Sequence, residues 1–178
     1  MSRLVALLRG VNLGAARRLP MADLRASMER LGYDDVHTVL QSGNVVYTGG
    51  DSADRSEQRI RAQLRDDTGM DVPVMVRTAR QMEAVVRRNP LSDHASDPKR
   101  HHVVFLAGRP AAARGASLDP AAFEPERFAL HGRELYVWWP DGAHRARLTL
   151  PAIERRLGVS GTARNWYTVE KLAELAAG

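Results

Sequence analysis

The sequence predicts an α+β protein, and three observations support this fold class. Short runs rich in β-branched and aromatic residues alternate with longer segments whose apolar residues recur at the spacing of one helix face. Glycine or proline stands where several of these segments end. In the first half the order is strand, helix, strand, strand, helix, strand, which is the split βαβ arrangement of a ferredoxin-like sheet.

The first half is expected to form this sheet as a subdomain of its own. Gly32 and Gly69 stand where the two helical patterns end, and Gly43 with Asn44 supplies the turn chemistry of a hairpin. Pro73 lies early in the last strand, and because proline cannot donate to a ladder, this strand is expected at an edge. The expected elements are a strand at 4–8, a helix at 20–31, a hairpin at 36–48, a helix at 51–68 and a strand at 72–76.

The second half is expected to form a related α+β subdomain, although no sequence repeat links the two halves. A loop is expected between its last two helices, with Thr168 as the cap of the final helix. We therefore expect two packed subdomains, residues 1–78 and 79–178. The expected elements are a helix at 79–88, a strand at 102–107, an alanine-rich linker or short helix within 110–123, a hairpin at 127–139 and helices at 150–157 and 169–177.

The composition is that of a soluble globular protein. Of the 178 residues, 44% are hydrophobic and 26% are charged. A chain of this length can bury a hydrophobic core in one large domain or in each of two small domains. No apolar run reaches the roughly 18 residues of a membrane span, and the apolar part of the N-terminus is too short for a signal peptide. A cytoplasmic protein without membrane partners is expected.

Several classes of chemistry are excluded or disfavoured. The chain has no cysteine, so disulfides, thiolate metal sites and cysteine nucleophiles are excluded. His101 and His102 are adjacent on an expected strand and point to opposite faces, and no HExxH spacing occurs. No P-loop or GxGxxG motif is present either. The sequence therefore predicts neither a metal site nor a cofactor.

Two polar stretches are expected to meet at one edge of the first sheet. In the predicted topology the first two strands are parallel, so their carboxyl ends lie at the same edge. Arg9, Gly10 and Asn12 leave the first strand there, while the turn of the hairpin supplies Gln41, Ser42 and Asn44. The first helix also starts at this edge, and its unpaired N–H groups favour an anion.

Three motifs resemble those of a bacterial family known as domain of unknown function 1697. They are LLRGVNLG at 7–14, QSGNVV at 41–46 and TARNWYTVEKL at 162–172. The chain departs from the family pattern at 15–18, where AARR replaces a glycine and a lysine-bearing segment, and at Val39-Leu40, where a tyrosine is usual. The resemblance implies an α+β fold with ferredoxin-like elements, and it implies no activity.

The functional hypothesis is a polar pocket for a small ligand that carries a phosphate or carboxylate group. Arginine offers a planar fork to such a group, asparagine and serine can orient it, and glycine lets the backbone approach it. Alternatively, the arginines pair with carboxylates or cap helices, and the asparagines hold turns. The expected ligand-binding residues are Arg9, Gly10, Asn12, Gln41, Ser42 and Asn44, joined through the family resemblance by Arg164, Asn165 and Trp166.

Other functions stay open. Catalysis by Ser42 would need a base that the sequence does not identify, so enzyme activity is undecided. The net charge of +5 is compatible with nucleic acid, but the two central strands offer only Tyr47 for stacking on bases. The neighbouring Trp138 and Trp139 point to opposite faces of a strand, which leaves a protein-interaction or self-assembly module as a third class. The oligomeric state is not predicted.

Overall fold

The computed structural model describes the whole chain, from Met1 to Gly178. It is an α+β protein with two four-stranded sheets and six α-helices, which confirms the predicted fold class. The elements in order are β1 (Ser2–Leu8), α1 (Met21–Arg30), β2 (Asp34–Val39), β3 (Asn44–Gly49), α2 (Ala53–Thr68), β4 (Val74–Thr78), α3 (Ala79–Arg88), β5 (His101–Leu106), α4 (Ala112–Ala116), β6 (Arg127–His131), β7 (Glu134–Trp138), α5 (Leu150–Leu157), β8 (Gly161–Asn165) and α6 (Trp166–Ala177).

The chain divides into two compact units. The first unit holds Met1–Ala84 together with Leu172–Gly178, and the second unit holds Val85–Lys171. The division falls inside α3 and again inside α6, so each of these helices contributes residues to both units. The predicted division into domains at residues 78 and 79 stays a prediction.

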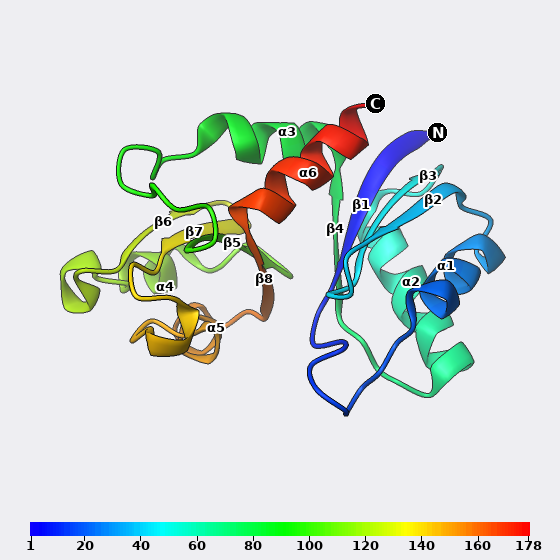
Figure 1. The fold of residues 1–178 in the computed structure, drawn as a ribbon, viewed down its shortest axis with the longest axis horizontal. Coiled ribbons are helices and arrows are strands. Elements are labelled where there is room, and N and C mark those ends of the chain that lie inside the picture. The colour runs from blue at the N-terminus through cyan, green and yellow to red at the C-terminus, as the bar shows by residue number, and fades with distance from the viewer. The chain divides into compact units, whose positions relative to one another are not determined.

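The first unit has a ferredoxin-like sheet. Its strand order is β2-β3-β1-β4, and every neighbouring pair is antiparallel. Helices α1 and α2 lie side by side over one face of this sheet (Figure 1). Alternate residues of β1, among them Leu4 and Leu8, pack with Leu24, Ile60 and Leu64 of the helices in one apolar core. The edge position of β4 agrees with the proline that precedes it.

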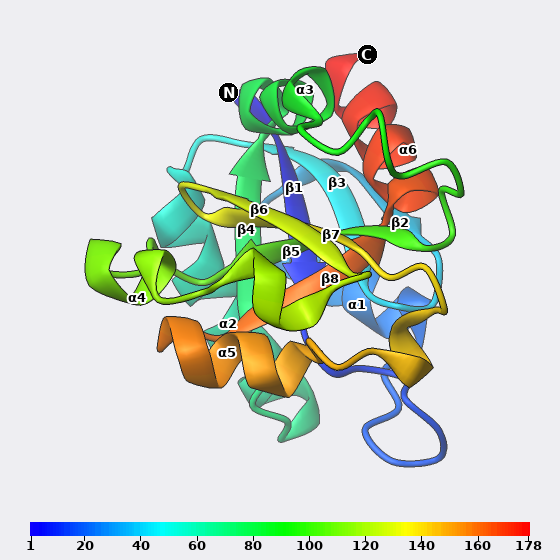
Figure 2. The ribbon, with the colours of Figure 1, turned by 90° about the vertical axis from the view of Figure 1, so that its left-hand side faces the viewer.

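The second unit repeats this topology. Its order along the chain is β5, α4, β6, β7, α5, β8, and its strand order in the sheet is β6-β7-β5-β8. Helix α5 lies along the second sheet (Figure 2). Its residues Ile153 and Leu157 belong with Val104 and Leu135 to a second apolar core. The two subdomains predicted from the sequence are thus related as expected, and both are ferredoxin-like.

Each sheet also has a hydrogen bond at an equivalent place, between the end of its first strand and its hairpin. The N–H of Leu8, the last residue of β1, donates to the carbonyl of Gly43 at 2.8 Å. The N–H of Leu106, the last residue of β5, donates to the carbonyl of Arg133 at 2.9 Å. In each unit the end of the first strand is therefore tied to the turn of the following hairpin.

One part of the second half differs from the sequence prediction. Strand β8 occupies part of the segment where a loop was expected, and α6 begins at Trp166, before the expected start. The cap of α6 is Asn165, whose Oδ1 accepts from the Thr168 N–H at 3.0 Å and from the Thr168 hydroxyl at 2.9 Å. The prediction that Thr168 caps the helix was wrong, because Thr168 lies in its first turn and donates to the cap.

No helix of the structure combines the length and the apolar character that crossing a membrane requires.

Candidate functional site

The β1–α1 loop (residues 9–20) and the β2–β3 turn (residues 40–43) meet at one edge of the first sheet. Asn12 joins them, because its Nδ2 donates to the carbonyls of Gln41 at 2.7 Å and of Leu19 at 2.9 Å. Its Oδ1 accepts from the N–H of Leu19 at 2.8 Å. The amide of Asn12 thus holds the loop closed on itself and ties it to the turn.

This edge also concentrates unusual backbone conformations. Four non-glycine residues of the chain have a left-handed φ, and three of them lie here: Asn12 at 55°, Arg17 at 56° and Leu40 at 61°. A left-handed φ is uncommon for residues with a side chain and costs of order 1 kcal/mol or more at each position. The surrounding hydrogen bonds hold these conformations in place.

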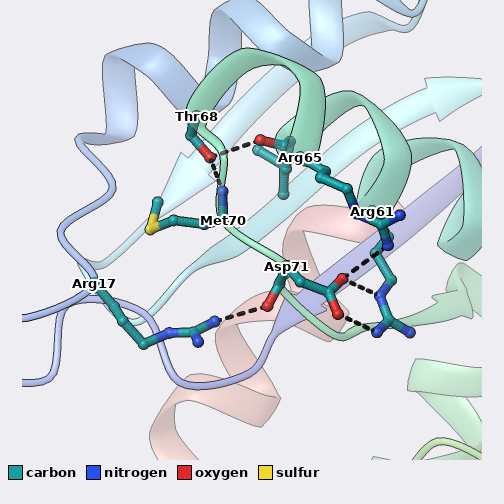
Figure 3. A network of polar contacts seen from close by, with 7 residues as sticks. Arg17, Arg61, Arg65, Thr68, Met70 and Asp71 are labelled. Carbon is teal, nitrogen blue, oxygen red and sulfur yellow. Dashed lines mark hydrogen bonds and ion pairs between the residues drawn. The ribbon is translucent and has the colours of Figure 1, made fainter.

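Arg17 fixes the loop from its other side. Its Nε donates to the carbonyl of Gly10 at 3.0 Å, and its Nη2 donates to the carbonyl of Asp71 at 2.9 Å (Figure 3). The N–H of Asn12 in turn donates to the carbonyl of Arg17 at 3.1 Å. The loop is therefore clamped at both ends by side chains that reach main-chain atoms.

Arginines outnumber carboxylates beside this loop. The carboxylate of Asp71 accepts from Nε and Nη2 of Arg61, both at 2.6 Å, and from Nη2 of Arg65 at 3.1 Å (Figure 3). These guanidinium groups hold the pKa of Asp71 well below its usual range. Arg17 lies at the main-chain carbonyl of the same residue, so three guanidinium groups contact Asp71 and two of them contact its carboxylate. Arg18 adds an exposed side chain without a hydrogen-bond or ion-pair partner.

The turn depends on glycine and on a buried asparagine. A Cβ on Gly43 would lie 2.7 Å from Val11 Cγ2 and 2.8 Å from Leu8 Cβ, so only glycine fits against the loop. Asn44 is fully buried, and its Nδ2 donates to the carbonyl of Val39 at 2.8 Å and to the hydroxyl of Ser42 at 2.9 Å. Asn44 therefore maintains the turn from within.

The residues exposed at this edge are of mixed character. Leu13 and Leu40 are 74% and 58% exposed, and they are two of the few large apolar residues on the surface. Gln41 and Ser42 are exposed beside them, while Arg9 and Gly10 are half-buried. The edge thus presents cationic, polar and apolar groups together.

The other three predicted site residues lie in the second unit. Arg164 on β8 is only 7% exposed, and its Nη1 donates to the Thr162 hydroxyl at 2.6 Å and to the Ala163 carbonyl at 2.9 Å. Burial lowers its pKa to about 10. Asn165 caps α6, and the ring of Trp166 stacks on His101 with centroids 4.4 Å apart. The single pocket that would unite these residues with those of the first unit stays a prediction.

Sequence reasoning missed the cationic residues around the loop. In the sequence, Arg17 and Arg18 stand out only as departures from the family pattern. Arg61 and Arg65 are four residues apart on α2, and this spacing places them on one helix face. That spacing is the signal which could have identified them, although nothing local links them to Asp71. No group of three or more histidine, aspartate or glutamate side chains is arranged to hold a metal ion.

Comparisons with known proteins identify a family and support the fold. A family model described as protein of unknown function (DUF1697) matches residues 1–136, which confirms the resemblance seen in the motifs. No curated protein matches the chain. The solved structure of a conserved bacterial protein, SP0830 from Streptococcus pneumoniae, is similar with a TM-score of 0.76 and 21% identity, over 98% of each chain. At this identity the similarity shows the fold alone.

Proposed function

We propose that this chain, which belongs to the DUF1697 family of proteins of unknown function, binds a small ligand with a phosphate or carboxylate group at the loop edge of its first sheet. One observation carries the proposal: the side chain of Asn12 ties the β1–α1 loop to the β2–β3 turn, with its Nδ2 2.7 Å from the Gln41 carbonyl. Both the loop and the turn contain non-glycine residues with a left-handed φ. Strained non-glycine residues cluster at ligand clamps, where the surrounding structure holds them. A loop fixed in advance also lowers the entropy cost of binding.

The charge around the loop favours an anion. Arg18 is exposed and carries no partner, Arg9 is half-buried at the end of β1, and the guanidinium groups at Asp71 leave local positive charge in excess. A guanidinium group can donate two parallel hydrogen bonds to a phosphate or carboxylate. We assign charge recognition to Arg9 and Arg18.

The polar residues of the two loops divide into two roles in this proposal. The side-chain amides of Asn12 and Asn44 form hydrogen bonds with the protein's own main chain, so these two residues serve as positioning residues. Gln41 and Ser42 have exposed side chains and orient the ligand, while Gly10 allows close approach of the main chain. The proposal is for binding in the cytoplasm and includes no reaction.

Nucleic acid is the alternative partner, and the position of Tyr47 decides whether the first sheet could stack on its bases. Tyr47 is the aromatic side chain of the central strands in the first sheet, and it is buried in the core beneath the helices. Bases therefore have no aromatic platform there, which leaves only contacts between arginines and the phosphate backbone.

The proposal is tested by thermal unfolding in the presence of inorganic phosphate, nucleotides, sugar phosphates, small carboxylic acids and short oligonucleotides. Variant Arg18→Ala removes the proposed charge contact, and Arg80→Ala removes an exposed arginine on α3 as a matched control. We expect at least one small anion to raise the Tm of the wild type and of Arg80→Ala, and to raise that of Arg18→Ala several-fold less. A Tm unaffected by every small anion, or a shift that Arg80→Ala reduces equally, would refute the proposal. Stabilisation by oligonucleotides alone, with a steep salt dependence, would establish the alternative.

A further inference from the structure

The second unit has its own version of the loop edge. The N–H of Arg9, just after β1, donates to the carbonyl of Pro73 at 2.9 Å, and the N–H of Ala107, just after β5, donates to the carbonyl of Ser160 at 2.8 Å. Across this edge the Nη2 of Arg133 donates to the carbonyl of Ala107 at 2.8 Å. A side chain thus ties the segment after the first strand to the hairpin turn, as Asn12 does in the first unit.

A cavity of about 550 Å³ lies at this edge, between α4 and the turn from β6 to β7. Small residues of α4, among them Ala112 and Gly115, form one wall, and Leu130 contributes an apolar side chain. Arg109 and His131 also line it, and no carboxylate does. The volume lies within the range of about 300–1,000 Å³ that is typical of sites for small molecules.

Two glycines shape the cavity: Gly115 lies against Leu130, and Gly132 lies beside Arg109. A Cβ on Gly115 would lie 3.0 Å from Leu130 Cδ2, so the absence of a side chain lets α4 approach the hairpin closely. A Cβ on Gly132 would lie 3.6 Å from Arg109 Nη2, which places this guanidinium group against the turn. Neither Arg109 nor His131 has a side-chain hydrogen bond or ion pair within the protein. Their polar atoms are therefore available to a ligand.

We infer that this cavity is a second binding site, for a small molecule that joins one carboxylate or phosphate group to an apolar part. Arg109 and His131 face the anionic group, and Leu130 with the alanines of α4 contacts the apolar part. An arginine suits either oxyanion because its guanidinium group donates two parallel hydrogen bonds. The inference does not rest on the function proposed for the first unit, because the two sites share no residue.

The test uses isothermal titration calorimetry with three probes: hexanoate for a carboxylate, phenyl phosphate for a phosphate, and hexan-1-ol as the uncharged match to hexanoate. We expect hexanoate, phenyl phosphate or both to bind the wild type, and hexan-1-ol to bind at least tenfold more weakly than hexanoate if hexanoate is the ligand. The probe that binds identifies the anionic group. Failure of both anions to bind at millimolar concentration would overturn the inference.

Variants locate the binding. Arg109→Ala should weaken it at least tenfold, and Ala112→Leu, which fills the cavity with a residue of nearly as high helix propensity, should abolish it. Arg145→Ala removes an exposed arginine of the same unit that does not line the cavity, and it should leave the affinity unchanged. Arg18→Ala separates the two proposed sites: binding that Arg109→Ala weakens and Arg18→Ala does not belongs to this cavity, whereas binding that only Arg18→Ala weakens belongs to the first unit and would refute the site. Equal weakening by Arg145→Ala, or full affinity in Ala112→Leu with a native circular dichroism spectrum, would refute the site.

Discussion

The two units share one topology but differ in how they fill the edge beyond their first strand. In the first unit the chain takes residues 9–20 to reach its first helix, and Val11 and Leu19 of this loop are buried in the apolar core. In the second unit residues 107–111 suffice, and a cavity stands beside them. The same scaffold therefore supports either a packed loop or an open site, depending on the length of one connection.

Elsewhere the units agree in detail. Arg77 is the fourth residue of β4 and Arg164 the fourth of β8, and both are buried. The Nη1 of Arg77 donates to the carbonyl of Val76 at 3.0 Å, and the Nη1 of Arg164 donates to the carbonyl of Ala163 at 2.9 Å. Each strand then runs directly into a helix. The two units therefore share this junction between strand and helix, and they differ at the edge beyond their first strand.

The largest difference in stability should come from glycine at the two hairpin turns. Gly43→Ala places a Cβ within 2.8 Å of two side chains at a φ of 81°, and we expect a loss of about 4 kcal/mol from overpacking and left-handed strain. Gly132→Ala meets only Arg109 at 3.6 Å and should cost about 1 kcal/mol. Urea unfolding of both variants measures the difference. Similar losses would show that the first turn is no more tightly packed than the second.

The Asn12 clamp should account for the next largest effect. Asn12→Ala removes three hydrogen bonds to main-chain atoms and leaves alanine at a φ of 55°, which should cost about 3 kcal/mol. Gln41→Ala is the matched control, because the clamp uses only the main-chain carbonyl of Gln41, and it should stay within about 0.5 kcal/mol of the wild type. Denaturant midpoints of the two variants test this. A stable Asn12→Ala protein would mean that the loop holds its shape without the clamp.

A smaller effect should appear with pH in the second unit. Burial lowers the pKa of His101 from 6.5 to about 4, so the unfolded chain binds a proton between these values that the folded chain does not. This contribution to stability is fully present above pH 6.5 and is lost as the pH falls towards 4. We expect a loss of about 2 kcal/mol between pH 7 and pH 5. His101→Phe retains a ring against Trp166, and its unfolding free energy should fall less over the same interval. An unchanged pH dependence would contradict the assignment.

Two buried tyrosines should give the smallest effects, with opposite signs. The Tyr47 hydroxyl in the first unit is buried and forms no hydrogen bond of normal geometry, so Tyr47→Phe should raise the unfolding free energy by about 1 kcal/mol. The Tyr136 hydroxyl in the second unit donates to the Val85 carbonyl at 2.9 Å, so Tyr136→Phe should lower it by about 1 kcal/mol. Thermal unfolding of the pair checks the signs. A loss in both variants would mean that the Tyr47 hydroxyl has a partner such as a bound water.

The strands and helices of the first sheet, β1 to β4 with α1 and α2, could be predicted because their signals are local. Apolar alternation, helical spacing and turn residues all lie within a few residues of the elements that they define. Strand β8 lacks such a signal, since Gly161–Asn165 alternates no large apolar residues and gains its hydrogen bonds by pairing with β5. Its pairing is a property of the folded sheet rather than of the segment.

The candidate site was predictable only in part, for a similar reason. The topology placed Asn12 and Gln41 at one edge of the sheet, and the structure joins them directly. It did not show that the partner of Asn12 is a main-chain carbonyl, because every residue offers that group and no sequence pattern marks it. The guanidinium groups gathered at Asp71 come from segments far apart in the chain, so their assembly also depends on the fold.

The discontinuity of the first unit has a consequence for biosynthesis. Residues 172–178 belong to this unit, and the Leu175 carbonyl accepts from Nε of Arg3 on β1 at 3.3 Å. A ribosome makes Arg3 before the second unit and Leu175 only after every residue of the second unit. The nascent first unit therefore waits for its last helical segment throughout the synthesis of the second, and the unit that begins to emerge first is the one completed last.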